Sequence, residues 1–229
     1  MNKGFRRIVT VLLVLAILIA YPAATYAFSV YSTATIGILT IFSVNDGGSS
    51  SWNRSGHAWI SFKNFTHPPV EFGGLNVATN SEVTIGTFGN LEYYHVGIWY
   101  NLESYLVNQL NQMSGRVSLS MAITRSELDT INSLIDENDE WAVLNNCSSF
   151  AVKIWNAVSE DKLSAGSPNT PTSLISSIKS YDYYENNRTI VYNSTIGYVE
   201  DGIYYSENPY ELETDMVDFA VNNNIPLFG

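Results

Sequence analysis

Short segments in which apolar and polar side chains alternate fill the first half of the chain, and they constrain the fold most. In His57–Lys63, Ala58, Ile60 and Phe62 alternate with His57, Trp59 and Ser61. Successive side chains of a strand point to opposite faces of a sheet, so this pattern predicts a strand with one apolar face. Other strands are expected at 35–44, 70–77, 82–88 and 95–100. Short strands joined by tight turns favour an antiparallel meander.

Helical spacing follows in the second half. A helix is expected over 102–113, with Gly115 as its C-terminal stop, and a further strand over 117–123. The segment Thr124–Glu127 has the form of a capping box, which marks the start of another helix. Pro171 is well placed as the first residue of a short helix that ends near Ser180. Together these patterns predict an α+β fold.

The N-terminal segment, residues 1–27, has the features of a secretory signal peptide. Three basic residues precede an apolar run over Ile8–Ala20, and small residues stand before the expected cleavage point after Ala27. We therefore expect an exported protein whose residues 28–229 form one domain. In the alternative, the signal is not cleaved, and residues 8–20 anchor the protein to the membrane.

Acidic residues dominate the expected mature chain. Removing the three cations of residues 1–27, which contain no acid, takes the formal charge from −11 to −14. Such a charge argues against nucleic acid and anionic lipid surfaces as main partners. The C-terminal part, from about 181, is rich in tyrosine: eight of the fifteen tyrosines lie between Tyr181 and Tyr210. We interpret them mainly as half-buried β-surface, with a hairpin turn at 200–202.

Cys147, the one cysteine of the chain, stands where a helix is expected to begin. Asn145 and Asn146 are favourable N-cap residues, and apolar residues recur at helical spacing from Phe150 onward. A thiol in the first turn of a helix meets unsatisfied N–H groups and the positive end of the helix dipole, which favour the thiolate. Exported cysteines normally pair, so a lone cysteine is a free thiol or bridges to another molecule.

A catalytic cysteine needs a base, and the chain holds only three histidines: His57, His67 and His95. His57 is the best candidate because it opens a strand directly after Gly56, and its side chain faces away from the apolar side of that strand. His95 also begins an expected strand, whereas His67 lies in a turn beside two prolines.

The segment Asn146–Phe150 resembles two related families. It is similar to the Asp-Cys-Ser-x-hydrophobic signature of NlpC/P60 cysteine peptidases and to the Asn-Cys-x-x-Phe of lecithin–retinol-acyltransferase-like enzymes. His57 precedes Cys147, which is the order found in the circularly permuted, papain-like branch of this superfamily. The resemblance covers roughly His57–Val158. It implies an antiparallel sheet packed against the helix that carries the cysteine.

The resemblance also implies roles for individual residues. Cys147 would be the nucleophile, His57 the general base and then acid, and the backbone N–H of Cys147 an oxyanion donor. For the third group we expect Glu71, which begins the strand after that of His57; His67 and Asn64 are the alternatives. Asn146 stands where the peptidases carry aspartate.

These features favour an exported cysteine hydrolase that acts through a thioester, with an amide in cell-wall peptide as the expected substrate. A lipid or ester acyl group is the alternative substrate. A secreted binding module that uses the Tyr181–Tyr210 surface for glycan or protein is the alternative of another class. No cofactor is expected, and neither a metal-ligand spacing nor a phosphate-binding loop occurs in the sequence.

Overall fold

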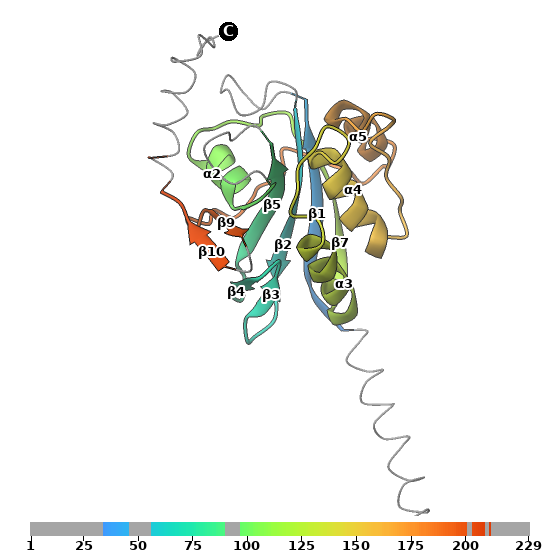
Figure 1. Ribbon diagram of the computed structural model, residues 1–229. Helices are drawn as coiled ribbons and strands as arrows, with labels where there is room; N and C mark the ends of the chain where they lie inside the picture. Colours follow the sequence, from blue (N-terminus) through green and yellow to red (C-terminus); the bar gives the residue numbers. More distant parts are fainter. Residues whose placement is uncertain (1–33, 46–55, 90–96, 201–202, 209–210, 212–229) are drawn as a thin grey trace, which may run out of the picture.

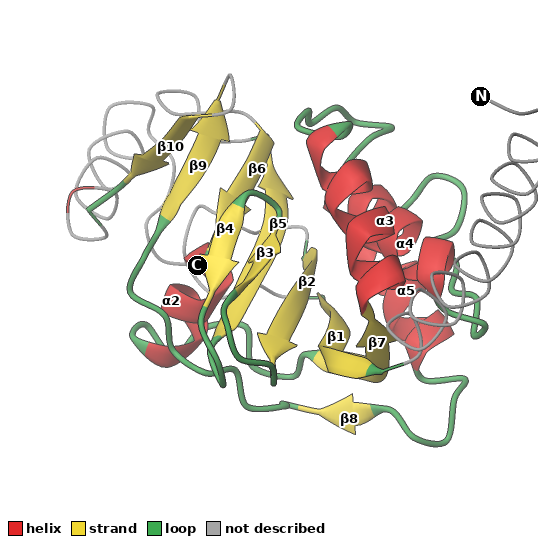
Figure 2. Ribbon diagram, turned by 90° about the horizontal axis from the view of Figure 1, so that it is seen from below, coloured by secondary structure: helices red, strands yellow, loops and turns green. Residues whose placement is uncertain are grey.

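An eight-stranded sheet lies between two helical layers (Figures 1 and 2). The structure, a computed structural model, describes residues 34–45, 56–89, 97–200, 203–208 and 211. The order of strands in the sheet is β10-β9-β6-β5-β2-β1-β7-β8, and the pairings are antiparallel. Helices α3, α4 and α5 gather on one face, and α2 lies on the other. The expected α+β class is confirmed.

Four strands that follow one another in the sheet form the predicted meander, interrupted only by a small hairpin. They are β1 (Thr35–Val44), β2 (His57–Asn64), β5 (Glu82–Phe88) and β6 (Gly97–Tyr100). β7 (Val117–Thr124) pairs with the other side of β1, and β8 (Glu185–Asn186) completes that edge.

The expected strand over 70–77 is wrong. The chain forms two short strands instead, β3 (Val70–Phe72) and β4 (Leu75–Val77), which pair as a separate hairpin. Gly73 and Gly74 connect them with φ angles of 56° and 83°. This left-handed conformation suits glycine and turns the chain back on itself. The apolar pattern continues on both sides of the turn, which is why the sequence predicted a single strand.

The described residues include four helices. They are α2 (Leu102–Asn108), α3 (Arg125–Asp136), α4 (Cys147–Val158) and α5 (Pro171–Ile178). The capping box at Thr124 and the N-terminal position of Pro171 are confirmed. The helix expected over 102–113 ends early, because Asn111 and Met113 take positive φ angles of 52° and 57° that an α-helix excludes.

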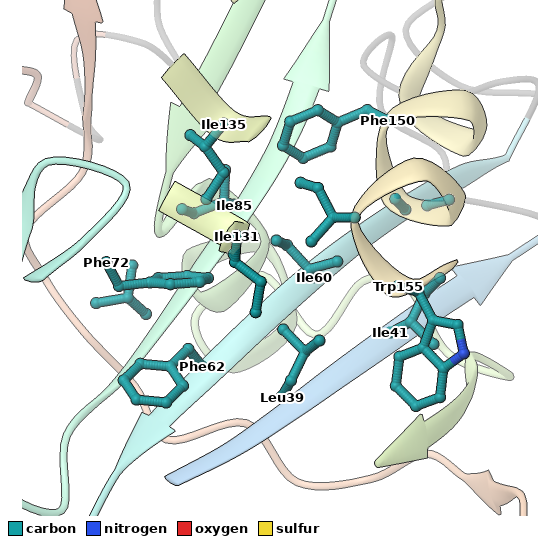
Figure 3. Close-up of a cluster of buried hydrophobic side chains, with 14 of the residues drawn as sticks. Leu39, Ile41, Ile60, Phe62, Phe72, Ile85, Ile131, Ile135, Phe150 and Trp155 are labelled. Carbon is teal, nitrogen blue, oxygen red and sulfur yellow. The ribbon is translucent and has the colours of Figure 1, made fainter. Parts of the chain in front are cut away.

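The alternation along β2 separates two hydrophobic cores. Its apolar face, with Ile60, packs under α3 and α4, where Phe150 and Trp155 point toward the sheet (Figure 3). Trp59, on the opposite face, packs with the residues of α2. His57 shares the face of Trp59, whereas α4 covers the other face. The histidine and the cysteine therefore belong to opposite layers and can meet only where β2 begins.

The C-terminal hairpin is confirmed by β9 (Gly197–Glu200) and β10 (Ile203–Ser206), which extend the sheet beyond β6. Tyr198 stacks on Tyr205 with ring centroids 5.2 Å apart, and both Tyr198 and Tyr204 are partly buried against the cores. Tyr198 and Tyr204 thus fit the interpretation as half-buried β-surface, whereas Tyr183, Tyr192 and Tyr205 are exposed, at 51%, 41% and 39%.

Several sequence expectations fall outside the described residues: the signal segment 1–27, His95, and the turn residues 201–202. Within the described ranges, none of the helices combines the length and the apolar character needed to cross a membrane.

Candidate active site

Cys147 is the first residue of α4, and Asn146 caps this helix as predicted. The Asn146 Oδ1 accepts hydrogen bonds from the backbone N–H groups of Ser148 (3.0 Å) and Ser149 (3.2 Å). Its Nδ2 donates to the carbonyl of Asn169 at 2.9 Å, which ties the helix start to the loop before α5. The cap leaves the N–H of Cys147 without a partner inside the helix, so this donor remains for another acceptor.

His57 begins β2 on the face opposite α4, in a packed aromatic setting. Its ring stacks near Trp59 with centroids 5.6 Å apart and lies 4.4 Å from the ring of Phe88. Gly56, immediately before it, has a φ of 85°, and a Cβ there would lie 2.5 Å from the carbonyl oxygen of Val44. The turn into β2 therefore requires glycine at 56, and the packing fixes the orientation of the imidazole.

Glu103, in the first turn of α2, is the carboxylate that reaches the histidine. Its Oε1 lies 2.9 Å from His57 Nε2, and its Oε2 accepts a hydrogen bond of 2.9 Å from the Thr84 hydroxyl. The residue is fully buried, with 0% exposure. Because Nε2 is engaged by Glu103, Nδ1 is the ring nitrogen left for the thiol.

The residues expected in this third role lie elsewhere. Glu71 is exposed on β3, in the separate β3–β4 hairpin, where it pairs with Asn76. Asn64 is buried, but its amide bonds to the backbone of its own turn and to the carbonyl of Val77. His67 is exposed, and its Nδ1 faces the hydroxyl of Thr79 at 3.4 Å. The geometry thus places Glu103, and not Glu71, beside His57.

The sequence predicted Glu71 because this residue begins the next apolar segment after the strand of His57, and that segment was expected to pair with it as the neighbouring strand. The Gly73–Gly74 turn diverts that segment out of the main sheet. One signal for Glu103 was present: an acid in the first turn of a segment that is otherwise rich in apolar residues, directly after a strand.

A buried polar network holds the start of α2 against β5. Asn101, with 0% exposure and a left-handed φ of 58°, accepts from the backbone N–H of Thr84 at 3.2 Å. Its Nδ2 donates to the carbonyl of Thr195 at 2.6 Å. Thr84 therefore contacts both Asn101, through its backbone, and Glu103, through its hydroxyl. This arrangement fixes the carboxylate beneath the histidine.

Gly86 of β5 forms the floor under the imidazole–carboxylate pair. A Cβ at this position would lie 2.0 Å from Glu103 Oε1 and 2.8 Å from His57 Nε2. Both contacts are closer than van der Waals packing allows, so any side chain at 86 would displace the pair. The pairing of β2 with β5 reaches Trp59 opposite Gly86. Beyond this pair, the N–H of Ala58 donates to the sulfur of Cys147.

The histidine and the cysteine shift each other's pKa. Burial alone would lower the pKa of His57, but the charge of Cys147, the hydrogen bond between the two side chains and the contact with Glu103 raise it to about 9. Burial would raise the pKa of the Cys147 thiol, yet the His57 charge and the hydrogen bonds from His57 and from the N–H of Ala58 lower it. The two side chains therefore favour each other's charged forms, the imidazolium and the thiolate.

The pair lies mostly out of solvent. Cys147 is 9% exposed and His57 is 3% exposed. Low exposure strengthens the attraction between a thiolate and an imidazolium. Within the described residues, no group of three or more His, Cys, Asp or Glu residues could hold a metal ion.

A rigid turn just before Cys147 presents two aliphatic side chains. Ala142 and Asn145 exchange backbone hydrogen bonds of 3.0 and 2.9 Å, and between them Val143 and Leu144 are 74% and 79% exposed. Asn146 Nδ2 also donates to the carbonyl of Val143 at 3.2 Å. The apolar tip of this turn is thus connected directly to the helix that carries the thiol.

Comparison with known proteins finds no relative: no family model matches the chain, and no curated protein or solved structure is significantly similar to it. The chemical interpretation therefore rests on the residues and their geometry.

Proposed function

We propose that this protein is an exported cysteine hydrolase of the permuted, papain-like NlpC/P60 type, which acts through a thioester. The observation that carries the proposal is the Cys147–His57–Glu103 arrangement. It combines a helix-start thiol, a buried imidazole that lowers the thiol pKa, and a carboxylate 2.9 Å from the far ring nitrogen. A nucleophile, its base and an orienting group in this relation are what acyl transfer requires.

The reaction follows from these positions. The Cys147 thiolate attacks the carbonyl carbon, and the oxyanion accepts a hydrogen bond from the N–H of Cys147. The His57 imidazolium gives its proton to the leaving amine or alcohol, which leaves a thioester and a neutral imidazole. Water then attacks the thioester and gives a proton to His57. The acid product departs and the ion pair is restored. Glu103 holds the ring so that the same nitrogen serves both steps.

For the substrate we propose an amide in cell-wall peptide. Two features support this choice: the signal-like segment at 1–27, and the resemblance of Asn146–Phe150 to wall-acting peptidases. The mechanism needs no cofactor, because the thiol, the imidazole and water supply every proton and bond of the cycle.

A second candidate substrate is an apolar acyl group, in a lipid amide or ester. The exposed Val143 and Leu144 favour it, because aliphatic side chains that are 74% and 79% exposed beside a nucleophile offer a contact for a hydrocarbon chain. Asn146, which replaces the aspartate of the peptidases, is shared with the acyltransferase-like signature.

The proposal is tested by the pH dependence of iodoacetamide alkylation, followed by hydrolysis of a panel of wall peptides and acyl esters. We expect an alkylation midpoint well below the ~8.5 of an ordinary cysteine, and an upward shift in His57→Ala. Cys147→Ser and His57→Ala should each abolish hydrolysis. Cys147→Ser should keep a thermal midpoint close to that of the wild type, whereas His57→Ala should also lower it, because the buried Glu103 carboxylate loses its partner. Wild-type turnover in either variant, or a thiol that reacts only after unfolding, would instead favour the binding module.

A further inference from the structure

A segment from the C-terminal part of the chain, residues 190–196, runs alongside α2, and we name it the strap (Figure 2). It forms no helix or strand of its own. Both of its ends are buried: Ile190 is 1% exposed and Ile196 is 0% exposed, and both belong to the same core as Leu102 and Leu106 of α2. The strap is therefore packed against α2 at two points by apolar contacts.

Ser104 of α2 bonds to the strap between these two points. Its hydroxyl donates to the carbonyl of Val191 at 3.3 Å and accepts from the backbone N–H of Asn193 at 3.0 Å. The side chain of Ser104 is 0% exposed. Its own backbone N–H donates at 3.4 Å to the Thr84 hydroxyl, which in turn donates to Glu103. One serine thus connects the strap to the carboxylate that contacts the imidazole.

A buried carboxylate of β5 anchors the strap to the sheet. Glu82 is 3% exposed, and its Oε2 accepts a hydrogen bond of 2.9 Å from the backbone N–H of Val191. Its Oε1 accepts from the Ser61 hydroxyl at 2.7 Å. The side chain of Asn193 also donates to the backbone carbonyl of Glu82 at 3.3 Å. Hydrogen bonds to a carboxylate are among the stronger ones in proteins, so the strap has a firm attachment to β5.

The first turn of α2 needs such support. The helix has seven residues, and isolated helices shorter than about 12–15 residues are marginal in water. Asn101, which precedes it, makes no capping hydrogen bond through its side chain; its amide donates instead to the strap, at the carbonyl of Thr195, at 2.6 Å. The turn that carries Glu103 is therefore held by the strap and by β5 together.

We propose that the strap is an active-site element and that Ser104 is a positioning residue, whose hydroxyl holds the first turn of α2 where Glu103 contacts His57. This inference rests on the proposed function, which gives the 2.9 Å contact between Glu103 and His57 its role. Among the described residues, the charged groups that face His57 are Glu103 from α2 and Cys147 from α4. Ser104 acts on the first of these, so its loss should weaken the stabilisation of the imidazolium.

The test compares Ser104→Ala with Ser159→Ala. Ser159 follows α4 at the end remote from the thiol, is 5% exposed, and its hydroxyl likewise donates to a carbonyl and accepts from an N–H, both of Asp161 at 3.1 Å. Both variants should lower the thermal midpoint by several degrees. In an NMR titration, Ser104→Ala should lower the pKa of His57 by about one unit, the lower end of what a lost charged neighbour causes. Ser159→Ala should leave it unchanged.

Two further variants show whether Ser104 acts through Glu103. In Glu103→Gln the carboxylate charge is absent, so adding Ser104→Ala should lower the thermal midpoint but shift the pKa of His57 no further. Glu82→Gln keeps the shape of the side chain but replaces one acceptor with a donor, which loosens the strap from the sheet. It should lower the pKa of His57 in the same direction as Ser104→Ala.

The outcomes separate the two proposals. A wild-type protein in which His57 titrates near its ordinary value of about 6.5 and the thiol is unperturbed would overturn the proposed function itself. A raised wild-type value that both Ser104→Ala and Glu82→Gln leave unchanged, despite their lower thermal midpoints, would overturn the role of the strap alone. An equal shift from Ser104→Ala with and without the Glu103 carboxylate would also overturn it, because Ser104 would then act by another route.

Discussion

Replacing Glu103 with glutamine tests the assignment that differs most from the sequence prediction. Glutamine has the same shape, and its amide can still bond to His57 on one side and Thr84 on the other. The substitution therefore removes the negative charge with little change in packing. The variant isolates what the carboxylate contributes to the state of the imidazole.

The expected size of the effect follows from the contact distance. A carboxylate this close, 2.9 Å from the ring nitrogen, stabilises the imidazolium, and an opposite charge within hydrogen-bonding range typically shifts a pKa by about 1–3 units. We expect the pKa of His57 to fall by this amount from about 9. One to three units correspond to about 1–4 kcal/mol of interaction with the charged ring.

In Glu103→Gln, the pH range over which the protein is active should become narrower, because its alkaline limit moves to lower pH. A raised histidine pKa means that the imidazolium persists up to about 9 in the wild type, and activity that needs it is lost as the pH rises through that value. In Glu103→Gln this loss should occur at lower pH. The imidazolium lowers the pKa of the Cys147 thiol, so in Glu103→Gln the thiolate should form only at higher pH than in the wild type.

The assay is an NMR titration of the His57 ring, combined with the alkylation profile of Cys147. Glu71→Gln serves as the matched control, because Glu71 is exposed on β3 and should leave both titrations unchanged. A folded Glu103→Gln protein in which His57 still titrates near the wild-type value would refute the argument. A shift caused by Glu71→Gln would restore Glu71 to the third role.

Two further substitutions, with Gly74→Ala as a control, test the residues that hold the site in place. Gly86→Ala should lower kcat by roughly 100-fold, because its Cβ would displace His57 and Glu103, and a misplacement of about 1 Å can reduce the rate by that factor. Gly74→Ala is strained at a φ of 83° but has no neighbours within 4 Å, so it should lower stability and leave the pH midpoint of Cys147 alkylation unchanged. Asn146→Ala should lower the free energy of unfolding by about 0.5–2 kcal/mol in urea denaturation, because the α4 cap is lost. An unchanged urea midpoint in Asn146→Ala, or wild-type kcat in Gly86→Ala, would contradict these assignments.

The sequence predicted those parts of the site that depend on interactions between neighbouring residues. The cap at Asn146, the position of Cys147 in the first turn of α4 and the start of β2 at His57 all follow from short-range preferences. The alternation along β2 also gave the correct face for His57, away from the apolar core under α4. Each of these features depends on a few neighbouring residues.

The third residue could not be found in this way, because its position depends on how distant segments fold together. Glu103 reaches His57 only because α2 crosses back over the face of the sheet and Asn101 takes a left-handed conformation at its start. Glu71 was expected from spacing, but the tight turn after Phe72 removes its strand from the main sheet. Sequence spacing does not report either event.

The two faces of the sheet contribute different halves of the site: α4 brings the thiol from one core, while His57 and Glu103 belong with the other. A chain in which only one of these cores has formed would hold a cysteine without its imidazolium, and the thiol would have ordinary reactivity. The contact between the thiol and the imidazole therefore forms only when both layers have closed on the sheet.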